Sequence, residues 1–157
     1  QEMAKTPPNI EVKDCTYTSC YCEENVYKLC EQFTRGAPEG RPSRCWAIWI
    51  SNPNKTVAVW RQRSRPGEGL AVWDYHVILA ASFGSSTDER VYIYDLDTTL
   101  PFPSPLDQYL ASAFRPTEAT TAQYQPCFRL VQSDEFLSNF SSDRSHMLSP
   151  SSPSGYT

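Results

Sequence analysis

Residues 70–80 read LAVWDYHVILA. Apolar side chains occupy both alternations of it, which is typical of a strand buried on both faces in the middle of a sheet. Two ionisable residues interrupt the run. By the period-two alternation of a strand, Asp74 and His76 share a face with Val72 and Ile78. The sequence therefore predicts a central strand that carries an imidazole.

The segments on either side of this strand are also predicted to be strands. VYIYDLD (91–97) follows it after the turn FGSSTDE (83–89) and is expected to be its antiparallel neighbour. CWAIWI (45–50) and TVAVWR (56–61) are joined by a turn-rich loop and are expected to pair as a hairpin. FRLVQ (128–132) predicts one further strand.

Amphipathic helices are predicted before and after these strands. The first begins just after Cys22, with Glu23 and Glu24 in its first turn and Gly36 at its end. Its apolar residues follow the spacing of one helix face: Val26, Leu29, Cys30 and Phe33. The second helix shows the same kind of pattern: Leu106, Tyr109, Leu110, Ala113 and Phe114. SDEFLSNF (133–140) predicts a short helix with Ser133 as its N-cap. The class indicated is α+β with a mostly antiparallel sheet.

Length and composition indicate one soluble domain with a tail at each end. The 157 residues are 39% hydrophobic and 20% charged, which is typical of a globular chain rather than a disordered one. Residues 1–13 are expected to form a tail and residues 14–147 the domain. Residues 148–157, LSPSSPSGYT, are rich in serine and proline and are expected to form an unpacked tail.

The charge and hydropathy argue against two classes of partner. A formal net charge of −4 argues against a nucleic-acid-binding protein, which would carry a basic patch. No apolar run approaches the roughly 20 residues that a membrane-spanning helix needs. The polar N-terminal residues lack the apolar stretch of a secretory signal. Six cysteines in such a chain favour a reducing compartment.

The cysteines could serve as metal ligands, disulfide partners or buried apolar side chains. The spacing C-x4-C-x-C-x7-C from Cys15 to Cys30 differs from the repeated C-x2-C of zinc sites. Cys20 and Cys22 are separated by one residue, and a disulfide between them would be strained. Free cysteine packs like a small apolar side chain. Burial as filler is therefore expected for most of them: Cys15, Cys20, Cys30, Cys45 and Cys127.

Cys22 differs from the others because a helix begins directly after it. The unpaired N–H groups and the macrodipole of a helix start stabilise an anion, which lowers the pKa of a thiol. The same N–H groups can hold an oxyanion beside the sulfur. Glu23 and Glu24 oppose a thiolate, so a cationic partner such as an imidazolium is needed.

The chain has two histidines that could partner this thiol. His146 lies in a polar segment near the C-terminal tail and is expected to be a surface residue. His76 lies in the predicted central strand. A carboxylate in the next strand could reach His76, fix its tautomer and stabilise the imidazolium. Asp95 and Asp97 share the required face, and the pattern leaves the choice between them open. The order Cys, His, Asp is that of papain-like and transglutaminase-like thiol enzymes.

Four sequence blocks carry a family resemblance. SCYCEEN (19–25), WDYHV (73–77), YDLDTTLPFP (94–103) and FSSDRSHM (140–147) occur in the order found in the protein N-terminal glutamine amidohydrolases. The chain closely resembles this family. The resemblance implies that Cys22 is the nucleophile, His76 the base and Asp95 the third member of a triad.

The resemblance also implies a fold, an activity and a cellular setting. The fold would be an α-β-α sandwich related to papain and the transglutaminases, acting as a monomer in cytosol and nucleus without metal or cofactor. The activity would be deamidation of an N-terminal glutamine side chain to glutamate with release of ammonia, feeding the Arg/N-degron route. Family members continue beyond FSSDRSHM with a further segment, whereas this chain ends in the Ser/Pro-rich tail. The alternative is a truncated, impaired member that at most binds peptide N-termini, or a related thiol peptidase or transglutaminase.

Recognition of a free N-terminus requires a partner for an α-ammonium group. Four carboxylates are candidates by charge and proximity to the triad: Glu23, Glu24, Asp74 and Asp97. Of these, Glu24 is expected to be simply a helix-dipole partner or a solvated carboxylate. Trp73, Tyr75 and Tyr21 are candidates for an aromatic wall, with Trp73 selected as the predicted substrate contact. The alternative is that the carboxylates are simply solvated and that the aromatic residues belong to the core.

Overall fold

The computed structural model describes residues 6–19, 21–115 and 121–144; for residues 141–144 it describes the main chain alone. Cys20, His146 and the tail expected at 148–157 lie outside this range. One short 3-10 helix, Val12–Asp14, precedes the first larger element, and two more, Pro38–Gly40 and Ala122–Tyr124, lie between later ones. Among the described residues, no helix combines the length and hydropathy of a membrane span.

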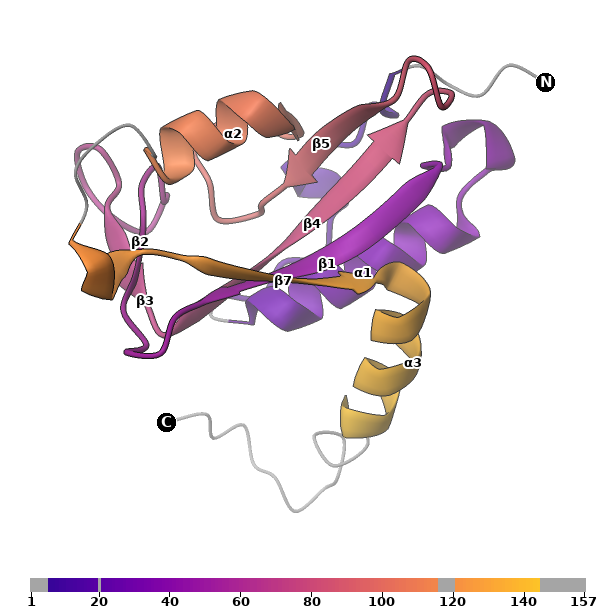
Figure 1. Cartoon of the computed structure of the whole chain (residues 1–157). Coiled ribbons are helices and arrows are strands. Elements are labelled where there is room, and N and C mark those ends of the chain that lie inside the picture. The colour runs from indigo at the N-terminus through magenta and orange to yellow at the C-terminus, as the bar shows by residue number, and fades with distance from the viewer. Residues whose placement is uncertain (1–5, 20, 116–120, 145–157) are drawn as a thin grey trace.

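The centre of the fold is an antiparallel five-stranded sheet with the strand order β6-β5-β4-β1-β7 (Figure 1). Its strands are β1 (Arg44–Ser51), β4 (Tyr75–Phe83), β5 (Arg90–Tyr94), β6 (Ser104–Pro105) and β7 (Cys127–Gln132). The long strand β4 lies in the middle and is buried along almost its whole length. The prediction of a central strand followed by its antiparallel neighbour is confirmed.

Helices cover both faces of this sheet. α1 (Cys22–Arg35) and α3 (Ser133–Arg144) pack on one face, and α2 (Leu106–Ala113) lies on the other (Figure 1). The core on the α1 side includes Leu29 and Phe33 of the helix and Val77 and Leu79 of β4. The core on the α2 side includes the alternate residues of β4, among them Ile78. The α+β class with a mostly antiparallel sheet is therefore confirmed.

The predicted hairpin between residues 45–50 and 56–61 is wrong. β1 pairs with β4 and β7, whereas β2 (Val57–Val59) pairs with β3 (Ala71–Trp73) in a separate two-stranded sheet. The loop after β1 contains Pro53 and a left-handed residue, Lys55 with φ 56°. This loop sends the chain away from β1, so that β2 takes its partner from the segment that precedes the central strand.

The single strand predicted over 70–80 is interrupted at Asp74. β3 ends at Trp73 and β4 begins at Tyr75, so Val72 and Asp74 belong to a different sheet environment from His76. Val72 and Asp74 are exposed, while His76 and Ile78 are buried. The expectation that these four residues share one face is wrong, because the alternation of side chains along a strand does not continue through the break at Asp74.

Two further expectations need correction. The strand predicted over 91–97 ends at Tyr94, so Asp95 and Asp97 lie in the turn that follows it. Cys127, expected to be buried filler, is exposed at the start of the edge strand β7. Cys30 is buried as expected, and Cys15 and Cys45 are half-buried.

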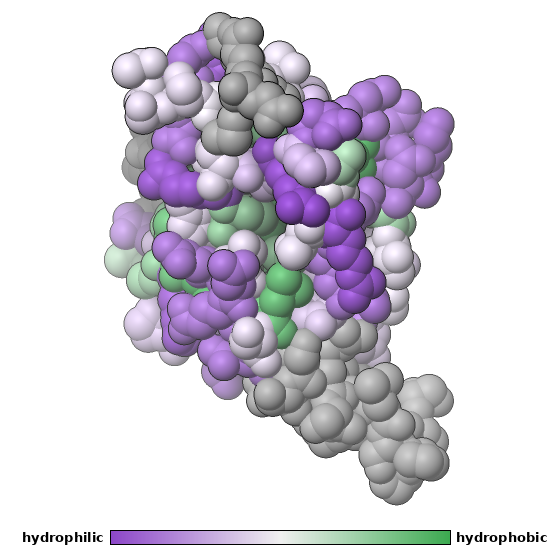
Figure 2. Space-filling view, turned by 90° about the vertical axis from the view of Figure 1, so that its right-hand side faces the viewer, coloured by the Kyte–Doolittle hydropathy of each residue, from purple (hydrophilic) through white to green (hydrophobic). Residues whose placement is uncertain are grey.

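Apolar surface is open along β7. A groove of about 370 Å³ runs over β1, β4 and β5 and is lined by apolar and aromatic side chains. Leu106 and Leu110 line it from α2, and Phe128 and Leu130 from β7. Leu130 is 59% exposed. A different side of the molecule, in Figure 2, is largely hydrophilic with a few apolar residues visible.

Candidate active site

The start of α1 places Cys22 beside the beginning of β4. Cys22 is the first residue of the helix, and the apolar helix face fixes that end against the sheet. Asn25, only 3% exposed, holds the segment before the helix. Its Oδ1 accepts from the main-chain N–H of Thr18 at 2.7 Å, and its Nδ2 donates to the Thr18 carbonyl at 2.9 Å.

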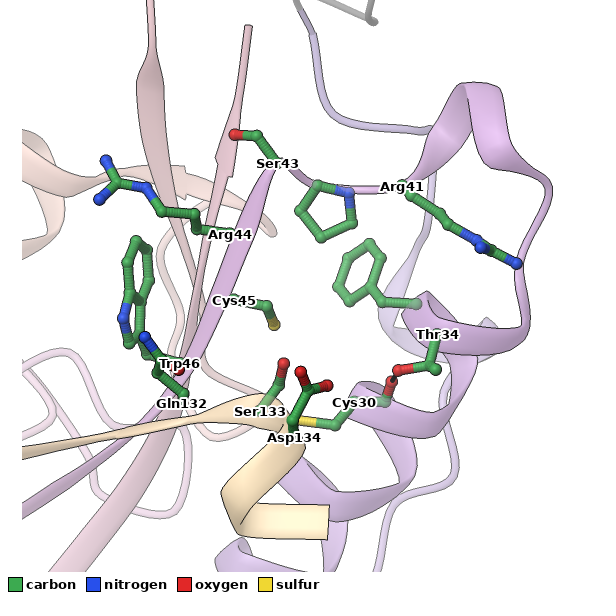
Figure 3. A pocket seen from close by; sticks show the side chains of 12 residues that line it. Cys30, Thr34, Arg41, Ser43, Arg44, Cys45, Trp46, Gln132, Ser133 and Asp134 are labelled. Carbon is green, nitrogen blue, oxygen red and sulfur yellow. Dashed lines mark hydrogen bonds between the residues drawn. The ribbon is translucent and has the colours of Figure 1, made fainter. Parts of the chain in front are cut away.

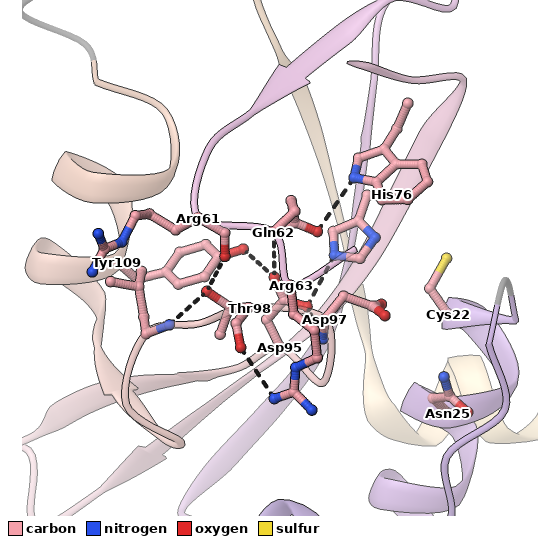
Figure 4. A network of polar contacts seen from close by, with 12 residues as sticks. Cys22, Asn25, Arg61, Gln62, Arg63, His76, Asp95, Asp97, Thr98 and Tyr109 are labelled. Atoms are coloured by element: carbon pink, nitrogen blue, oxygen red, sulfur yellow. Dashed lines mark hydrogen bonds and ion pairs between the residues drawn. The ribbon is translucent and has the colours of Figure 1, made fainter. Parts of the chain in front are cut away.

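His76 and Asp95 form a buried pair close to this thiol (Figure 4). His76 Nε2 and Asp95 Oδ1 are 3.0 Å apart. In the β4–β5 register Tyr94 is the last paired residue, opposite Leu79, so Asp95 reaches the ring from just beyond the strand. Of the two carboxylates that the sequence pattern left open, Asp95 is the one hydrogen-bonded to His76.

Both oxygens of Asp95 accept additional hydrogen bonds. Oδ1 accepts from the main-chain N–H of Asp97 at 2.9 Å. Oδ2 accepts from the Tyr109 hydroxyl at 2.7 Å and from Gln62 Nε2 at 3.4 Å. A buried charge is tolerated only when it is paired and hydrogen-bonded, and these contacts meet that requirement.

The two partners shift each other's pKa in opposite directions. Burial lowers the pKa of His76, but the charge of Asp95 and the hydrogen bond to it outweigh burial and hold that pKa well above 6.5. Burial raises the pKa of Asp95, but the charge and hydrogen bond of His76, with the Tyr109 hydroxyl, hold it below its ordinary value. Asp95 therefore stabilises the imidazolium that forms when the His76 ring accepts a proton.

The thiol of Cys22 differs from the sequence-based expectation. Burial raises its pKa above 9.0, although hydrogen bonding and charge from His76 act in the opposite direction. Glu23 raises it further, and Sγ donates to Glu23 Oε2 at 3.5 Å. The sequence predicted a lowered pKa for this thiol, and that prediction is wrong, because burial makes the largest contribution and raises the pKa. A neutral thiol next to an imidazole with a raised pKa is suited to transfer its proton to that ring.

Three of the four residues predicted to contact substrate lie near the triad. Trp73 stacks on the His76 ring with centroids 6.0 Å apart and planes at 17°. Asp97 accepts from the Tyr17 hydroxyl at 2.7 Å, and Glu23 Oε1 accepts from the Tyr75 hydroxyl at 3.0 Å.

Asp74 is placed differently. It is exposed at the break between β3 and β4. None of the hydrogen bonds described above around Cys22 and His76 involves it.

Sequence reasoning missed four polar residues that hold the site: Tyr17, Asn25, Gln62 and Tyr109. Tyr109 was predicted only as part of an apolar helix face, but its hydroxyl reaches Asp95. Gln62 directly follows the strand predicted over 56–61, in the polar sequence QRSRPG, which contains no signal for burial. It is fully buried, and its main chain forms an isolated bridge with Thr98.

Three side chains of the site lie close enough together to be candidate metal ligands: His76, Asp95 and Asp97. One ligand atom from each lies within 4.8 Å of the others, among the residues the structure describes. Asp95 already accepts four hydrogen bonds through its two oxygens. The cluster is thus accounted for by an oriented imidazole–carboxylate pair.

Two cavities lie near these elements. One of about 320 Å³ lies between the C-terminal half of α1, the start of β1 and the start of α3, and it contains no triad residue (Figure 3). Cys30 and Cys45 line it together with Arg41 and Asp134. A second, of about 10 Å³, lies against Cys22 and Asp97 and is about the size of one water molecule.

Comparison with known proteins identifies the family. The family model for N-terminal glutamine amidase matches residues 17–155. The protein N-terminal glutamine amidohydrolase of Bos taurus is 46% identical over 133 residues, which are 85% of this chain and 62% of the relative. The Homo sapiens protein of that name is 44% identical over 85% of this chain and 63% of the relative.

The Drosophila melanogaster protein of the same name is 43% identical over 89% of this chain and 67% of the relative. The chain thus spans a little under two thirds of the bovine and human relatives. Both the family match and these identities lead to one conclusion: the chain belongs to the N-terminal glutamine amidase family.

Proposed function

We propose that this protein deamidates the side chain of an N-terminal glutamine to glutamate and releases ammonia. The observation that carries the proposal is the buried His76–Asp95 pair, with 3.0 Å between Nε2 and Oδ1, beside a thiol at a helix start. The names of the bovine and human relatives supply the substrate. Cys22 acts as nucleophile, His76 as acid and base, and Asp95 orients the ring.

The first half of the reaction forms a thioester. His76 takes the proton of the Cys22 thiol, and Sγ bonds to the carboxamide carbon. Main-chain N–H groups at the start of α1 stabilise the oxyanion, because the first turn of a helix leaves them unpaired. The C–N bond then breaks, and the imidazolium gives its proton to the leaving nitrogen as ammonia departs.

The second half hydrolyses the thioester. His76 removes a proton from water, the oxygen bonds to the acyl carbon, and the C–S bond breaks. The imidazolium returns a proton to Sγ, which restores the starting thiol. General acid–base assistance of this kind is typically worth about 10²–10⁴-fold in rate.

Asp97 is the best placed partner for the α-ammonium group of the substrate. Its carboxylate lies within 4.8 Å of His76, and the Tyr17 hydroxyl holds it. Burial raises its pKa, so a cation beside it would compensate a costly charge. Glu23 and Trp73 form the rest of the proposed subsite, and Asp74 remains a prediction from the sequence.

The architecture and setting are proposed on the same basis. Helices on both faces of the sheet support an α-β-α sandwich related to papain and the transglutaminases. Five free thiols among the described residues fit a reducing compartment, here cytosol and nucleus. We further propose that the protein acts as a monomer and that its product enters the Arg/N-degron route.

Ammonia release and peptide mass test the proposal. A peptide beginning with Gln should gain about one mass unit, while peptides beginning with Asn or acetyl-Gln should not change. Cys22→Ala should abolish the reaction, and Cys20→Ala should retain most of it. Full activity in Cys22→Ala would rule the mechanism out. Cleavage or transfer products would point to a thiol peptidase or transglutaminase, and binding without turnover to an impaired family member.

A further inference from the structure

His76, Asp95 and Gln62, which are labelled in Figure 4, form a closed ring of contacts with Trp73. His76 Nε2 lies 3.0 Å from Asp95 Oδ1, and Gln62 Nε2 donates to Asp95 Oδ2 at 3.4 Å. Gln62 Oε1 accepts from Trp73 Nε1 at 3.3 Å. Trp73 closes the ring by stacking on His76, with 17° between the planes. Gln62 thus joins the indole above the imidazole to the carboxylate beside it.

The chemistry of the neighbours dictates an amide at position 62. An indole N–H can only donate, so the amide oxygen must face Trp73. An ionised carboxylate can only accept, so the NH₂ group must face Asp95. A leucine of similar size satisfies neither neighbour. A glutamate satisfies Trp73 but can donate to Asp95 only when it is protonated.

The backbone around Gln62 is built to hold this side chain in place. Gln62 N–H donates to the Gly69 carbonyl at 2.8 Å, and the residue also bridges to Thr98. Gly69 has φ +71°, and a Cβ there would lie 2.6 Å from Gln62 N. Only glycine permits this close approach. Gln62 itself is 0% exposed.

We infer that Gln62 is a positioning residue that fixes Trp73 over His76 and orients Asp95, and this rests on the proposed Cys22–His76 chemistry. It acts through its neighbours and touches no reacting atom. A misplacement of about 1 Å near reacting groups can cost about 10²-fold in rate. Loss of Gln62 should therefore lower kcat through the misplaced imidazole, with a smaller rise in KM for the peptide because Trp73 also forms part of the proposed subsite.

The decisive variant is Gln62→Glu, compared with the wild type at each pH. Burial and the charge of Asp95 raise the pKa of a glutamate at this position. Below that pKa the protonated glutamate donates to Asp95 as the amide does, and the variant should match the wild type. Above it two carboxylates face each other, and the ratio of variant to wild-type rate should fall at least about 10-fold.

Gln62→Leu and Ser82→Ala complete the series. Gln62→Leu should lower the rate by about 10–100-fold at every pH, because it can never donate to Asp95. Ser82 is also buried and hydrogen-bonded, at the far end of β4 from His76, so Ser82→Ala should behave as the wild type. If Gln62→Leu does not fold, Gln62→Glu under acidic conditions still tests the inference.

Two readouts separate this inference from the proposed function. One is ammonia release, and the other is alkylation of Cys22 by iodoacetamide, followed on the Cys22 peptide by mass spectrometry. The rate of alkylation measures the reactivity of the Cys22 thiol beside its imidazole partner, even if the chain turns over no substrate. A Gln62→Glu to wild-type ratio that falls with rising pH supports the inference. A ratio that stays constant with pH in both assays overturns it, whatever the substrate proves to be.

Discussion

Two buried tyrosines offer a matched test of how the site is held together. Tyr109 and Tyr94 are 0% and 1% exposed, so Tyr→Phe removes one buried hydroxyl in each case. The Tyr109 hydroxyl donates to Asp95 Oδ2 at 2.7 Å. The Tyr94 hydroxyl has no hydrogen-bond partner among the described residues. The same chemical change should therefore have opposite consequences.

The magnitudes follow from the two environments. A hydrogen bond to a charged group is worth about 1.5–3 kcal/mol, so Tyr109→Phe should lower the free energy of unfolding by about that much. Tyr94→Phe removes a hydroxyl that lost its water on folding without gaining a partner. Its effect should range from zero to about 1 kcal/mol of stabilisation.

The pH dependence has a defined sign. The folded-state pKa of Asp95 is lowered, because His76 and Tyr109 outweigh burial. Such a group contributes stability above its unfolded pKa of about 4, and this stability is lost as pH falls through the folded value. Tyr109→Phe removes one cause of the lowering. Its cost should therefore be complete at pH 7 and shrink below about pH 4, whereas Tyr94→Phe should show no such trend.

Urea denaturation followed by circular dichroism measures both variants. The midpoints and slopes at pH 7 give the two free energies, and a series toward acid pH gives the trend. Equal losses of stability in the two variants would refute the reasoning, because they would show that the hydroxyl contact with Asp95 contributes nothing. A cost for Tyr109→Phe that stays constant to pH 3 would show that the carboxylate charge is not involved.

Three further outcomes are expected. Asp95→Asn removes the charge that raises the pKa of His76 and leaves the opposing effect of burial, so the acid limb of the pH–rate profile should move down by about one unit or more. An unchanged limb would exclude this pair as its origin. Asp97→Asn should raise KM for a Gln-starting peptide roughly tenfold with little change in kcat, since a charge-assisted contact is lost; an unchanged KM would place the α-ammonium elsewhere. Leu130→Lys should reduce concentration-dependent light scattering without lowering the unfolding midpoint, because Leu130 is 59% exposed on an edge strand.

Local patterns predicted the elements well where one face of each is buried. The helix from Cys22 and the helix at Leu106–Ala113 follow from periodicity, because the burial of one face imposes the spacing. The partner of a strand does not follow in this way. Residues 56–61 satisfy a hairpin with β1 on sequence grounds, yet Val57–Val59 pair with Ala71–Trp73.

The pKa of Cys22 likewise depends on one feature that the sequence shows and on another that only the tertiary fold sets. Its position at a helix start is readable in the sequence, and that position favours a thiolate. The depth at which the helix packs is a property of the tertiary fold, and the resulting desolvation raises the pKa instead. In the proposed mechanism the proton leaves through His76, which lies 54 positions later in the chain.

Spacing and short motifs in the sequence predicted the helices, most of the strands and the three residue types of the proposed triad. The hydrogen bond between Asp95 and His76, and the contacts of Gln62 and Tyr109 with Asp95, are features of the tertiary structure. Those contacts join residues 14 to 33 positions apart across separate elements. No local pattern encodes them, because each depends on how the turn after β5 meets a loop and a helix that are placed by the packing of the whole chain.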